Sequence, residues 1–181
     1  MPVTESRKAK HLVAGVAALA LASAMGVATA AAASAAPPVS KPVEDLGPID
    51  LDPGFACTFG LRVEGVGSKQ KTKTWTDQNG NPVRVLTAGK GYDLTFTNLS
   101  NNNILAFPSN GSVEKKTINA DGTQTVQATG HNVVILFPTD FPAGPSTTLY
   151  TGRLVYTVDG AGNFTVQSTS GRATDICALL A

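Results

Sequence analysis

The sequence predicts an all-β fold, an antiparallel meander of about eight to ten short strands in which a closed β-barrel is favoured over a two-sheet β-sandwich. Three observations lead to this prediction. After residue 54, apolar and polar residues alternate through many short segments, which is the period of a half-buried strand. Turns rich in Gly, Asn and Asp separate these segments, so neighbouring segments form hairpins. The two cysteines lie near the two ends of this region, which predicts that the first and last strands are neighbours and that the barrel closes.

Residues 1–35 have the composition of a secretory signal peptide. Basic residues at positions 7–10 precede an apolar stretch at residues 12–27, and Ala-Ser-Ala at positions 33–35 forms a cleavage site. An uncleaved membrane anchor is the alternative, which the small residues after the apolar stretch disfavour. We therefore expect a secreted, extracellular protein with no membrane association after cleavage.

The remaining chain is of the length of one domain. Removal of the leader changes the formal net charge from +1 to −1, because three basic residues and one acidic residue leave with it. A nearly neutral protein offers no electrostatic reason to expect a nucleic-acid partner. The composition therefore favours neither a nucleic-acid-binding protein nor one that binds anionic membranes.

The domain is predicted to begin after an extended, proline-rich lead-in at residues 36–54 and to occupy residues 55–181. Its first strand is predicted over residues 55–64, where Phe55, Cys57, Phe59, Leu61 and Val63 share one face. Further strands are expected over residues 69–76, 83–88, 92–99, 104–107, 113–118, 123–128, 133–137, 149–158 and 164–168. Gly152 is interpreted as a bulge inside its strand. No useful helix is expected after the leader.

Two cysteines in an exported chain are expected to form one disulfide, between Cys57 and Cys177. The residues 133–137 (Val-Val-Ile-Leu-Phe) are apolar at every position, so both faces of this strand need cover. We expect the lead-in, the loop at residues 138–148 or a second subunit to cover the pair Val134 and Leu136.

No catalytic residue, metal site or cofactor site is predicted. His131 has no nucleophile elbow to accompany it, so it is interpreted as a polar residue at a strand end. The sequence Asp77-x-Asn79-x-Asn81 resembles the start of a calcium loop, but Pro82 and Ala88 stand where the loop needs Gly and Glu. We interpret this segment as a hairpin turn.

Two sets of residues are candidates for ligand binding. Tyr92, Tyr150 and Tyr156 belong to the apolar faces of their strands and are predicted to point into a barrel cavity that holds a small apolar ligand. A filled core is the alternative for these residues.

The second set is a cationic strip with an aromatic residue. Lys69, Lys71, Lys73 and Trp75 share one face of their strand and suit an anionic wall polymer or a sugar. The alternative is an edge strand whose lysines discourage pairing with another sheet.

The segment from Gly171 to Ala181 ends in Thr-Asp-Ile-Cys-Ala-Leu-Leu and resembles the C-terminus of small secreted actinobacterial β-rich proteins of unassigned function. The similarity also covers the turn at residues 77–80 and the strand segment at residues 149–154. This resemblance implies export and a pair of bonded cysteines, and it implies no activity.

The sequence predicts a non-catalytic, disulfide-linked binding protein whose partner is a small apolar ligand or a wall polysaccharide. An extracellular enzyme, such as an isomerase or hydrolase using a barrel cavity, is the first alternative. A surface module that binds polymers through Trp75 and its neighbouring lysines is the second. The state of the interior separates these functions, because an enclosed cavity supports the first two and a filled core supports the third.

Overall fold

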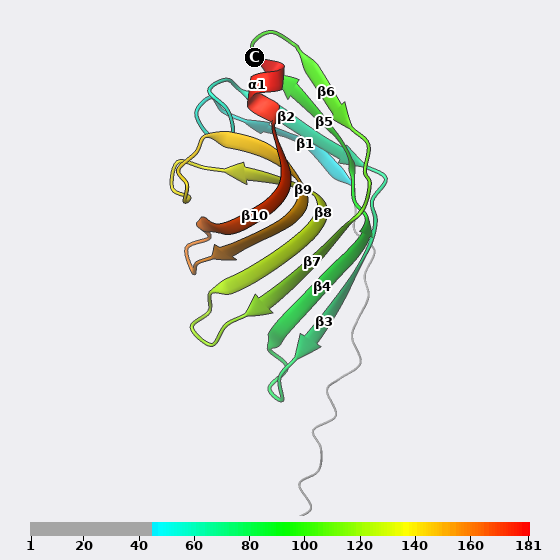
Figure 1. Cartoon of the computed structure of the whole chain (residues 1–181), viewed down its shortest axis with the longest axis vertical. Coiled ribbons are helices and arrows are strands. Elements are labelled where there is room, and N and C mark those ends of the chain that lie inside the picture. Colours follow the sequence, from blue (N-terminus) through cyan, green and yellow to red (C-terminus); the bar gives the residue numbers. More distant parts are fainter. Residues whose placement is uncertain (1–44) are drawn as a thin grey trace, which may run out of the picture. The chain divides into compact units, whose positions relative to one another are not determined.

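The computed structural model describes residues 45–181 (Figure 1). The predicted signal peptide and residues 36–44 of the predicted lead-in lie outside this range. Within it the chain forms ten strands and one short helix, so the prediction of an all-β fold is confirmed. The helix is too short to span a membrane, and no other helix occurs in residues 45–181.

The strands form two antiparallel sheets. The smaller sheet has the order β1-β2-β5-β6, with β1 (Leu46–Leu51), β2 (Leu61–Val66), β5 (Asp93–Asn98) and β6 (Ile104–Phe107). The larger sheet has the order β10-β9-β8-β7-β4-β3, with β3 (Lys69–Thr76), β4 (Pro82–Lys90), β7 (Ser112–Ile118), β8 (Gln124–Leu136), β9 (Ser146–Val158) and β10 (Phe164–Asp175). Helix α1 (Ile176–Leu180) follows β10 directly.

The two sheets are parts of one meander. Short links at residues 67–68, 91–92 and 108–111 carry β2 into β3, β4 into β5, and β6 into β7. Each of these three chain segments, residues 61–76, 82–98 and 104–118, therefore contributes one strand to each sheet, and the three are neighbours in both sheets. Figure 1 shows the segments passing from one sheet to the other. The predicted meander is found, but three of its predicted hairpins are not, because β2 and β3, β4 and β5, and β6 and β7 lie in different sheets and do not pair with each other.

The closed barrel is not supported over the two-sheet alternative. Within residues 45–181 neither sheet closes on itself, because β1 and β6 form the edges of the smaller sheet and β3 and β10 those of the larger. The predicted pairing of the first strand with the last is wrong. The two ends of the meander are joined by a disulfide between a loop and a helix, so no backbone ladder is needed there.

Two segments near the start of the domain differ from the prediction. Residues 52–60 form turns in which the Gly54 amide donates to the Cys57 carbonyl at 2.8 Å, although residues 55–60 were expected to begin the first strand. The strand begins only at Leu61. Part of the predicted lead-in is instead strand β1, which pairs with β2 through Ile49–Val63 and Leu51–Leu61. The β-domain therefore includes residues that the sequence assigns to its lead-in.

A row of glycines crosses the larger sheet. The strand register places Gly89, Gly130, Gly152 and Gly171 in one line with Gln70 and Ser112. All four glycines have positive φ, between 92° and 138°. β8 continues through this row, so two segments predicted as separate strands form one strand. Gly152 keeps its register with both neighbours, so the predicted bulge is not found. Figure 1 shows β8, β9 and β10 bending in their middle, which glycine kinks permit.

The bend places residues 131–136 of β8 between two hydrophobic cores. Val133 and Ile135 pack against the first core, which includes Phe96, Leu149 and the residues around the disulfide. Val134 and Leu136 lie in the second core and are only 7% and 4% exposed. The prediction that this pair is covered is confirmed, but the predicted cover is wrong. The apolar residues around the pair come from β8, β9 and β10 of the same bent sheet, and not from the lead-in, the loop at residues 138–148 or a second subunit. They are Ala128, Tyr150, Leu154, Tyr156, Phe164 and Val166.

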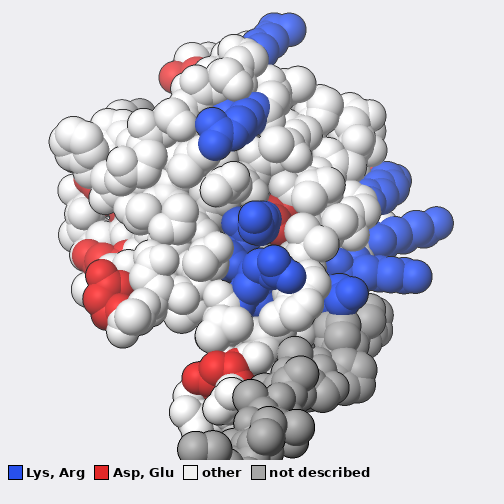
Figure 2. Space-filling view, turned by 60° about the horizontal axis from the view of Figure 1, so that its bottom comes forward, with Lys and Arg blue, Asp and Glu red and all other residues white. Residues whose placement is uncertain are grey.

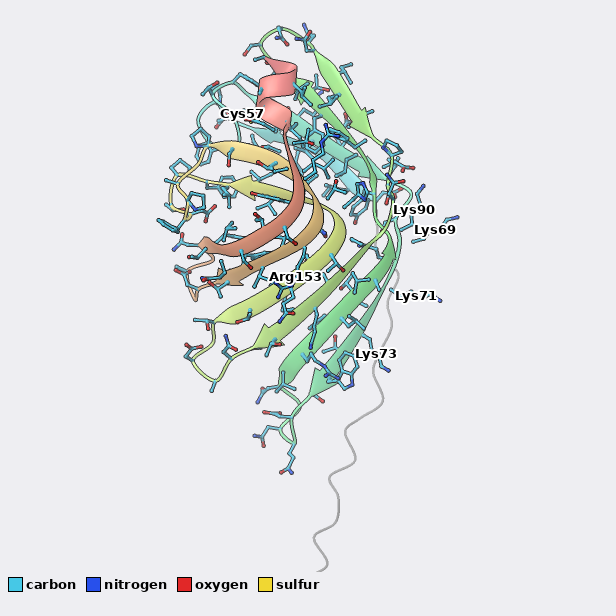
Figure 3. All side chains as sticks on the ribbon, viewed as in Figure 1. Cys57, Lys69, Lys71, Lys73, Lys90 and Arg153 are labelled. Atoms are coloured by element: carbon cyan, nitrogen blue, oxygen red, sulfur yellow. A yellow bond between two sulfur atoms is a disulfide. The ribbon has the colours of Figure 1, made fainter. Side chains whose placement is uncertain are left out.

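The outer face of the larger sheet carries many basic side chains. Figure 2 shows Lys and Arg gathered over the middle and right of one view, with most acidic residues toward its left and lower margins. Lys69, Lys71, Lys73 and Lys90 extend away from the sheet in Figure 3. The three lysines of the predicted strip on β3 are therefore exposed, whereas its Trp75 is half-buried.

The predicted hairpin turn after β3 is confirmed. The Asp77 carboxylate accepts hydrogen bonds from the amides of Asn79 and Asn81 at 2.9 and 2.8 Å. These bonds, that from Asn81 above all, lower the pKa of Asp77. A similar turn, capped by Asp159, joins β9 to β10. In residues 45–181 no group of three or more potential ligands is placed to hold a metal ion.

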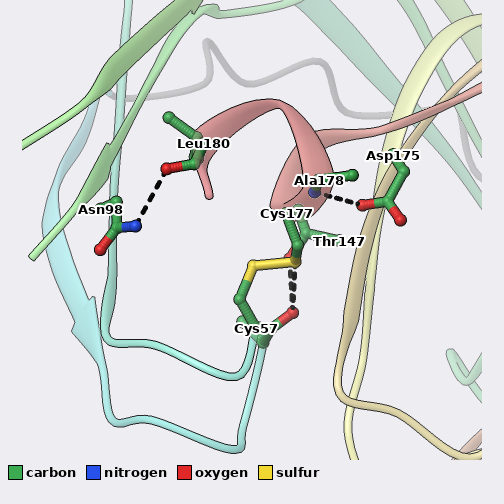
Figure 4. Close-up of a disulfide and its surroundings, with 8 residues drawn as sticks. Cys57, Asn98, Thr147, Asp175, Cys177, Ala178 and Leu180 are labelled. Carbon is green, nitrogen blue, oxygen red and sulfur yellow. Dashed lines mark hydrogen bonds between the residues drawn. A yellow bond between two sulfur atoms is a disulfide. The ribbon is translucent and has the colours of Figure 1, made fainter. Parts of the chain in front are cut away.

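The disulfide and helix α1 join the C-terminus to the smaller sheet (Figure 4). Cys57 and Cys177 are bonded, as predicted, with their Cα atoms 5.6 Å apart. The Thr147 hydroxyl donates to the Ala56 carbonyl at 3.0 Å beside this bond. The Leu180 carbonyl accepts hydrogen bonds from three side-chain amides, those of Asn98, Asn101 and Asn103. The carbonyls at a helix end have no partner within the helix, and this asparagine cluster supplies one.

Candidate functional site

The candidate site is a cavity where the two sheets diverge. The pairing of β7 with β8 ends at Ser112 and Gly130. Beyond this point the segment that contains β7 belongs to the smaller sheet as β6. Residues 131–136 of β8 stay in the larger sheet and pair with β9 alone. A cavity of about 430 Å³ lies beside this point. Its volume falls in the range of small-molecule sites.

Both sheets contribute apolar side chains to the cavity wall. These are Leu94, Phe107, Pro108, Ala128, Val133, Val134, Leu149 and Leu154. Leu94 and Phe107 also pack against the first core, and Ala128 and Leu154 belong to the second. The cavity therefore lies between the two cores, and its wall suits the apolar part of a ligand.

The polar part of the wall contains a buried donor without a partner. The side-chain nitrogen of Asn132 is buried, and within the described chain it makes no hydrogen bond. Asn132 lines the cavity. Buried polar groups nearly always have a partner, and leaving one unpaired costs about 1–3 kcal/mol. The nitrogen has almost no accessible surface, so a ligand in the cavity would reach it only after the Asn132 side chain turns.

Two hydrogen-bonded pairs of side chains add further polar groups to the cavity wall. The Gln70 amide donates to the Ser112 hydroxyl at 3.1 Å, next to the glycine row. The Tyr156 hydroxyl donates to the Glu114 carboxylate at 3.5 Å. All four of these residues line the cavity. Glu114 gives the wall a negative charge, so the site favours an uncharged or cationic ligand.

The surroundings of Tyr156 keep its hydroxyl group protonated. Burial is the main cause that raises the pKa of Tyr156 well above its usual value, and the Glu114 carboxylate raises it further. Phe164 stacks on the Tyr156 ring with the centroids 5.2 Å apart. The phenol therefore acts as a fixed hydrogen-bond donor toward Glu114, and its ring belongs to the second core.

This raised pKa predicts an alkaline loss of stability. A group whose pKa is higher in the folded state contributes stability that is complete below its unfolded pKa, about 10 for tyrosine, and that is lost as the pH rises toward the folded pKa. The free energy of unfolding should fall by up to about 1.4 kcal/mol per pH unit in that window. Urea unfolding between pH 8 and pH 11 measures this slope, and Tyr156→Phe should make it shallower. Equal slopes for the two proteins would contradict this assignment.

The predicted ligand-binding residues lie in three different places. Tyr92 and Tyr156 line the cavity, whereas Tyr150 packs in the second core and does not line it. All three tyrosines are half-buried, so none is fully enclosed as the barrel prediction requires. Trp75 lies on β3 outside the cavity, with the Arg84 guanidinium 3.9 Å from its ring centroid and the Lys73 ammonium 5.1 Å from it. The three predicted tyrosines therefore do not all line one cavity, and Trp75 lies outside it on the separate strip to which the sequence assigns it.

Five cavity residues were not predicted as site residues from the sequence: Gln70, Ser112, Glu114, Asn132, and His131, which was interpreted only as a polar strand-end residue. All five line the cavity. A signal was present at Asn132, an amide directly before the most apolar run of the chain. The alternation of Ser112, Glu114 and Lys116 also marks one face of β7, but only the register with β8 shows that this face is the inner one.

Comparison of the chain with protein-family models, with curated proteins and with solved structures finds no match.

Proposed function

We propose that the protein is a secreted, non-catalytic binding protein that holds a small, partly apolar and uncharged or cationic molecule in the cavity between its two cores. The observation that carries this proposal is the cavity itself, whose apolar wall comes from both sheets and whose polar groups include Glu114 and Tyr156. The signal-peptide composition of residues 1–35 and the resemblance to small secreted proteins support export.

The same site argues for binding over catalysis. Glu114 and Tyr156 form the hydrogen-bonded acid–base pair of the cavity wall. His131 also lines the cavity, but among the described residues its side chain has no hydrogen bond that would orient it for proton transfer. A general acid or base works best when its pKa lies near the working pH, and the pKa of Tyr156 is shifted upward, away from neutrality. The pair therefore positions polar groups of a ligand and is poorly suited to move a proton.

The proposal predicts binding of an uncharged apolar probe. N-phenyl-1-naphthylamine should bind with one site per protein, which a fluorescence titration measures. Ala128→Leu adds a larger side chain at a cavity-lining position and should weaken binding by about tenfold or more, because the added carbons take ligand space. Ala88→Leu is the matched control, since Ala88 lies outside the cavity lining, and it should change the affinity by less than about twofold.

A charged probe tests the electrostatic part of the proposal. The anionic 1-anilinonaphthalene-8-sulfonate should bind more weakly than the uncharged probe, because Glu114 repels it. Glu114→Gln should reduce this difference. Absence of saturable binding, or equal weakening by Ala128→Leu and Ala88→Leu with both variants folded, would exclude the cavity as a binding site.

A further inference from the structure

We propose that the outer face of the larger sheet binds an extended acidic polysaccharide through a cationic face composed of Lys69, Lys71, Lys73, Arg84, Lys90 and Lys115. This inference does not rest on the cavity, because none of the six residues lines it.

The strand register brings these side chains together. Lys69 lies opposite Lys90, and Lys73 lies opposite Leu86, which in turn lies opposite Lys115. Directly paired residues of an antiparallel sheet share one face, about 4.5–5.5 Å apart at Cβ. Arg84 lies opposite Trp75 and so belongs to the same face. All six basic side chains are exposed.

The charge on this face is of one sign. The acidic residue of β7, Glu114, alternates with Lys115 and points to the cavity side. Within the described residues, Lys90 is the one member of the cationic face with an ion pair, to Asp93 at 3.1 Å. Six cations therefore cluster in a protein whose formal net charge is only +1 over the whole sequence. Such a cluster attracts a polyanion through the field it creates.

Edge protection does not account for the whole cluster. Lysines on an edge strand discourage pairing with another sheet, and β3 is an edge strand. Arg84, Lys90 and Lys115, however, lie on β4 and β7, which are both paired on their two sides. The direct opposition of Lys69 and Lys90 is also unfavourable for the sheet. An anionic partner would turn this repulsion into attraction.

The neutral residues of this face favour a polysaccharide over a nucleic acid. Gln127 lies opposite Lys115 in the register, and Thr117 follows two residues later on the same face of β7. Both side chains are exposed, so they can exchange hydrogen bonds with sugar hydroxyls. Single-stranded nucleic acids bind by stacking bases on free aromatic faces. The ring of Trp75 already has Arg84 over it at 3.9 Å. The predicted signal peptide also places the protein among extracellular polymers.

The test uses polygalacturonate, a polysaccharide that carries carboxylates, with dextran as its uncharged counterpart. The purified protein should bind polygalacturonate and not dextran in isothermal titration calorimetry at low salt. Binding should weaken by about tenfold or more between 50 and 200 mM salt, because several counterions are released on association. Absence of binding to polygalacturonate at low salt would overturn the proposal.

A matched set of variants locates the binding face. The triple variant Lys71→Gln, Lys73→Gln and Lys115→Gln should bind polygalacturonate about tenfold more weakly or worse, with a shallower dependence on salt. The control variant Arg62→Gln, Lys116→Gln and Arg172→Gln removes the same charge from residues outside the cationic face and should retain most of the affinity. Equal losses in the two variants would show that net charge alone is involved, and would overturn the assignment of the face.

Two further probes separate the partner classes. Tighter binding to a single-stranded oligonucleotide than to polygalacturonate at matched charge would overturn the choice of a polysaccharide in favour of a nucleic acid. Tighter binding to phosphatidylglycerol vesicles would do so in favour of an anionic bilayer. Retention of N-phenyl-1-naphthylamine binding in the triple variant shows that the fold and cavity are intact, so a failure of the cationic face is distinguishable from a failure of the cavity.

Discussion

Replacing Cys57 by alanine should lower the melting temperature of the protein by on the order of 10 to 15 °C. The disulfide closes a loop with a sequence separation of 120 residues, and the chain-entropy model assigns a loop of this length roughly 4 to 5 kcal/mol. Whole domains are stable by only about 5–15 kcal/mol, so the bond contributes a large share.

The effect should arise mainly in the unfolded state. Without the disulfide, helix α1 still has Ile176 and Leu180 buried in the first core, and the Leu180 carbonyl still accepts from Asn98 at 3.0 Å. The variant should therefore keep a native circular dichroism spectrum at low temperature while its thermal transition moves down.

A cycle of variants tests whether the two cysteines act through one bond. Cys177→Ala should lower the melting temperature by about as much as Cys57→Ala, and the double variant should be no less stable than either single variant, because both changes remove the same link. Wild-type protein treated with a reductant should behave like the variants. Losses that add in the double variant, or two free thiols found by mass spectrometry, would contradict the bond.

Local features of the fold could be predicted from the sequence where the two-residue period was regular. β3 and β6 begin and end at the predicted residues, and the disulfide pair was predicted. The prediction failed where tertiary contacts override the pattern. Residues 55–60 alternate like a strand, but no neighbouring strand pairs with them. β1 has no clean period, and it forms because the edge of β2 is open to it.

The candidate site could be predicted only in part, because it depends on how the sheet divides. Tyr92 and Tyr156 were selected from their apolar faces and do line the cavity. Glu114 and Asn132 are brought to it by the register of β7, β8 and β9. Strand register is set by pairing, and a shift of one residue would turn Glu114 to the outer face. No periodicity in the sequence reveals such a junction.

Replacing Gly152 by alanine should destabilise the protein by about 2 to 5 kcal/mol, because two penalties combine. Gly152 has φ of +138°, a conformation that L-residues with a Cβ rarely adopt. An added Cβ would also overlap the backbone carbonyl oxygen of Ser170 on β10 and approach the Gly171 Cα to 3.1 Å. Since both obstacles are backbone atoms of a paired strand, the sheet itself would have to shift.

Two other glycines separate these penalties. Gly122 has φ of +83° but open space around its missing Cβ, so Gly122→Ala tests the backbone conformation alone and should be destabilised by about 1–2 kcal/mol. Gly160 has neither a positive φ nor a neighbour within 4 Å, so Gly160→Ala should change stability by less than about 0.5 kcal/mol. Urea unfolding measures all three variants. Because Gly152 lies in the row that bends the sheet beside the cavity, Gly152→Ala should also weaken binding of N-phenyl-1-naphthylamine, whereas the two control variants should not. A Gly152→Ala protein as stable as Gly160→Ala would show that the glycine row does not set the bend, and the cavity would then need another structural cause.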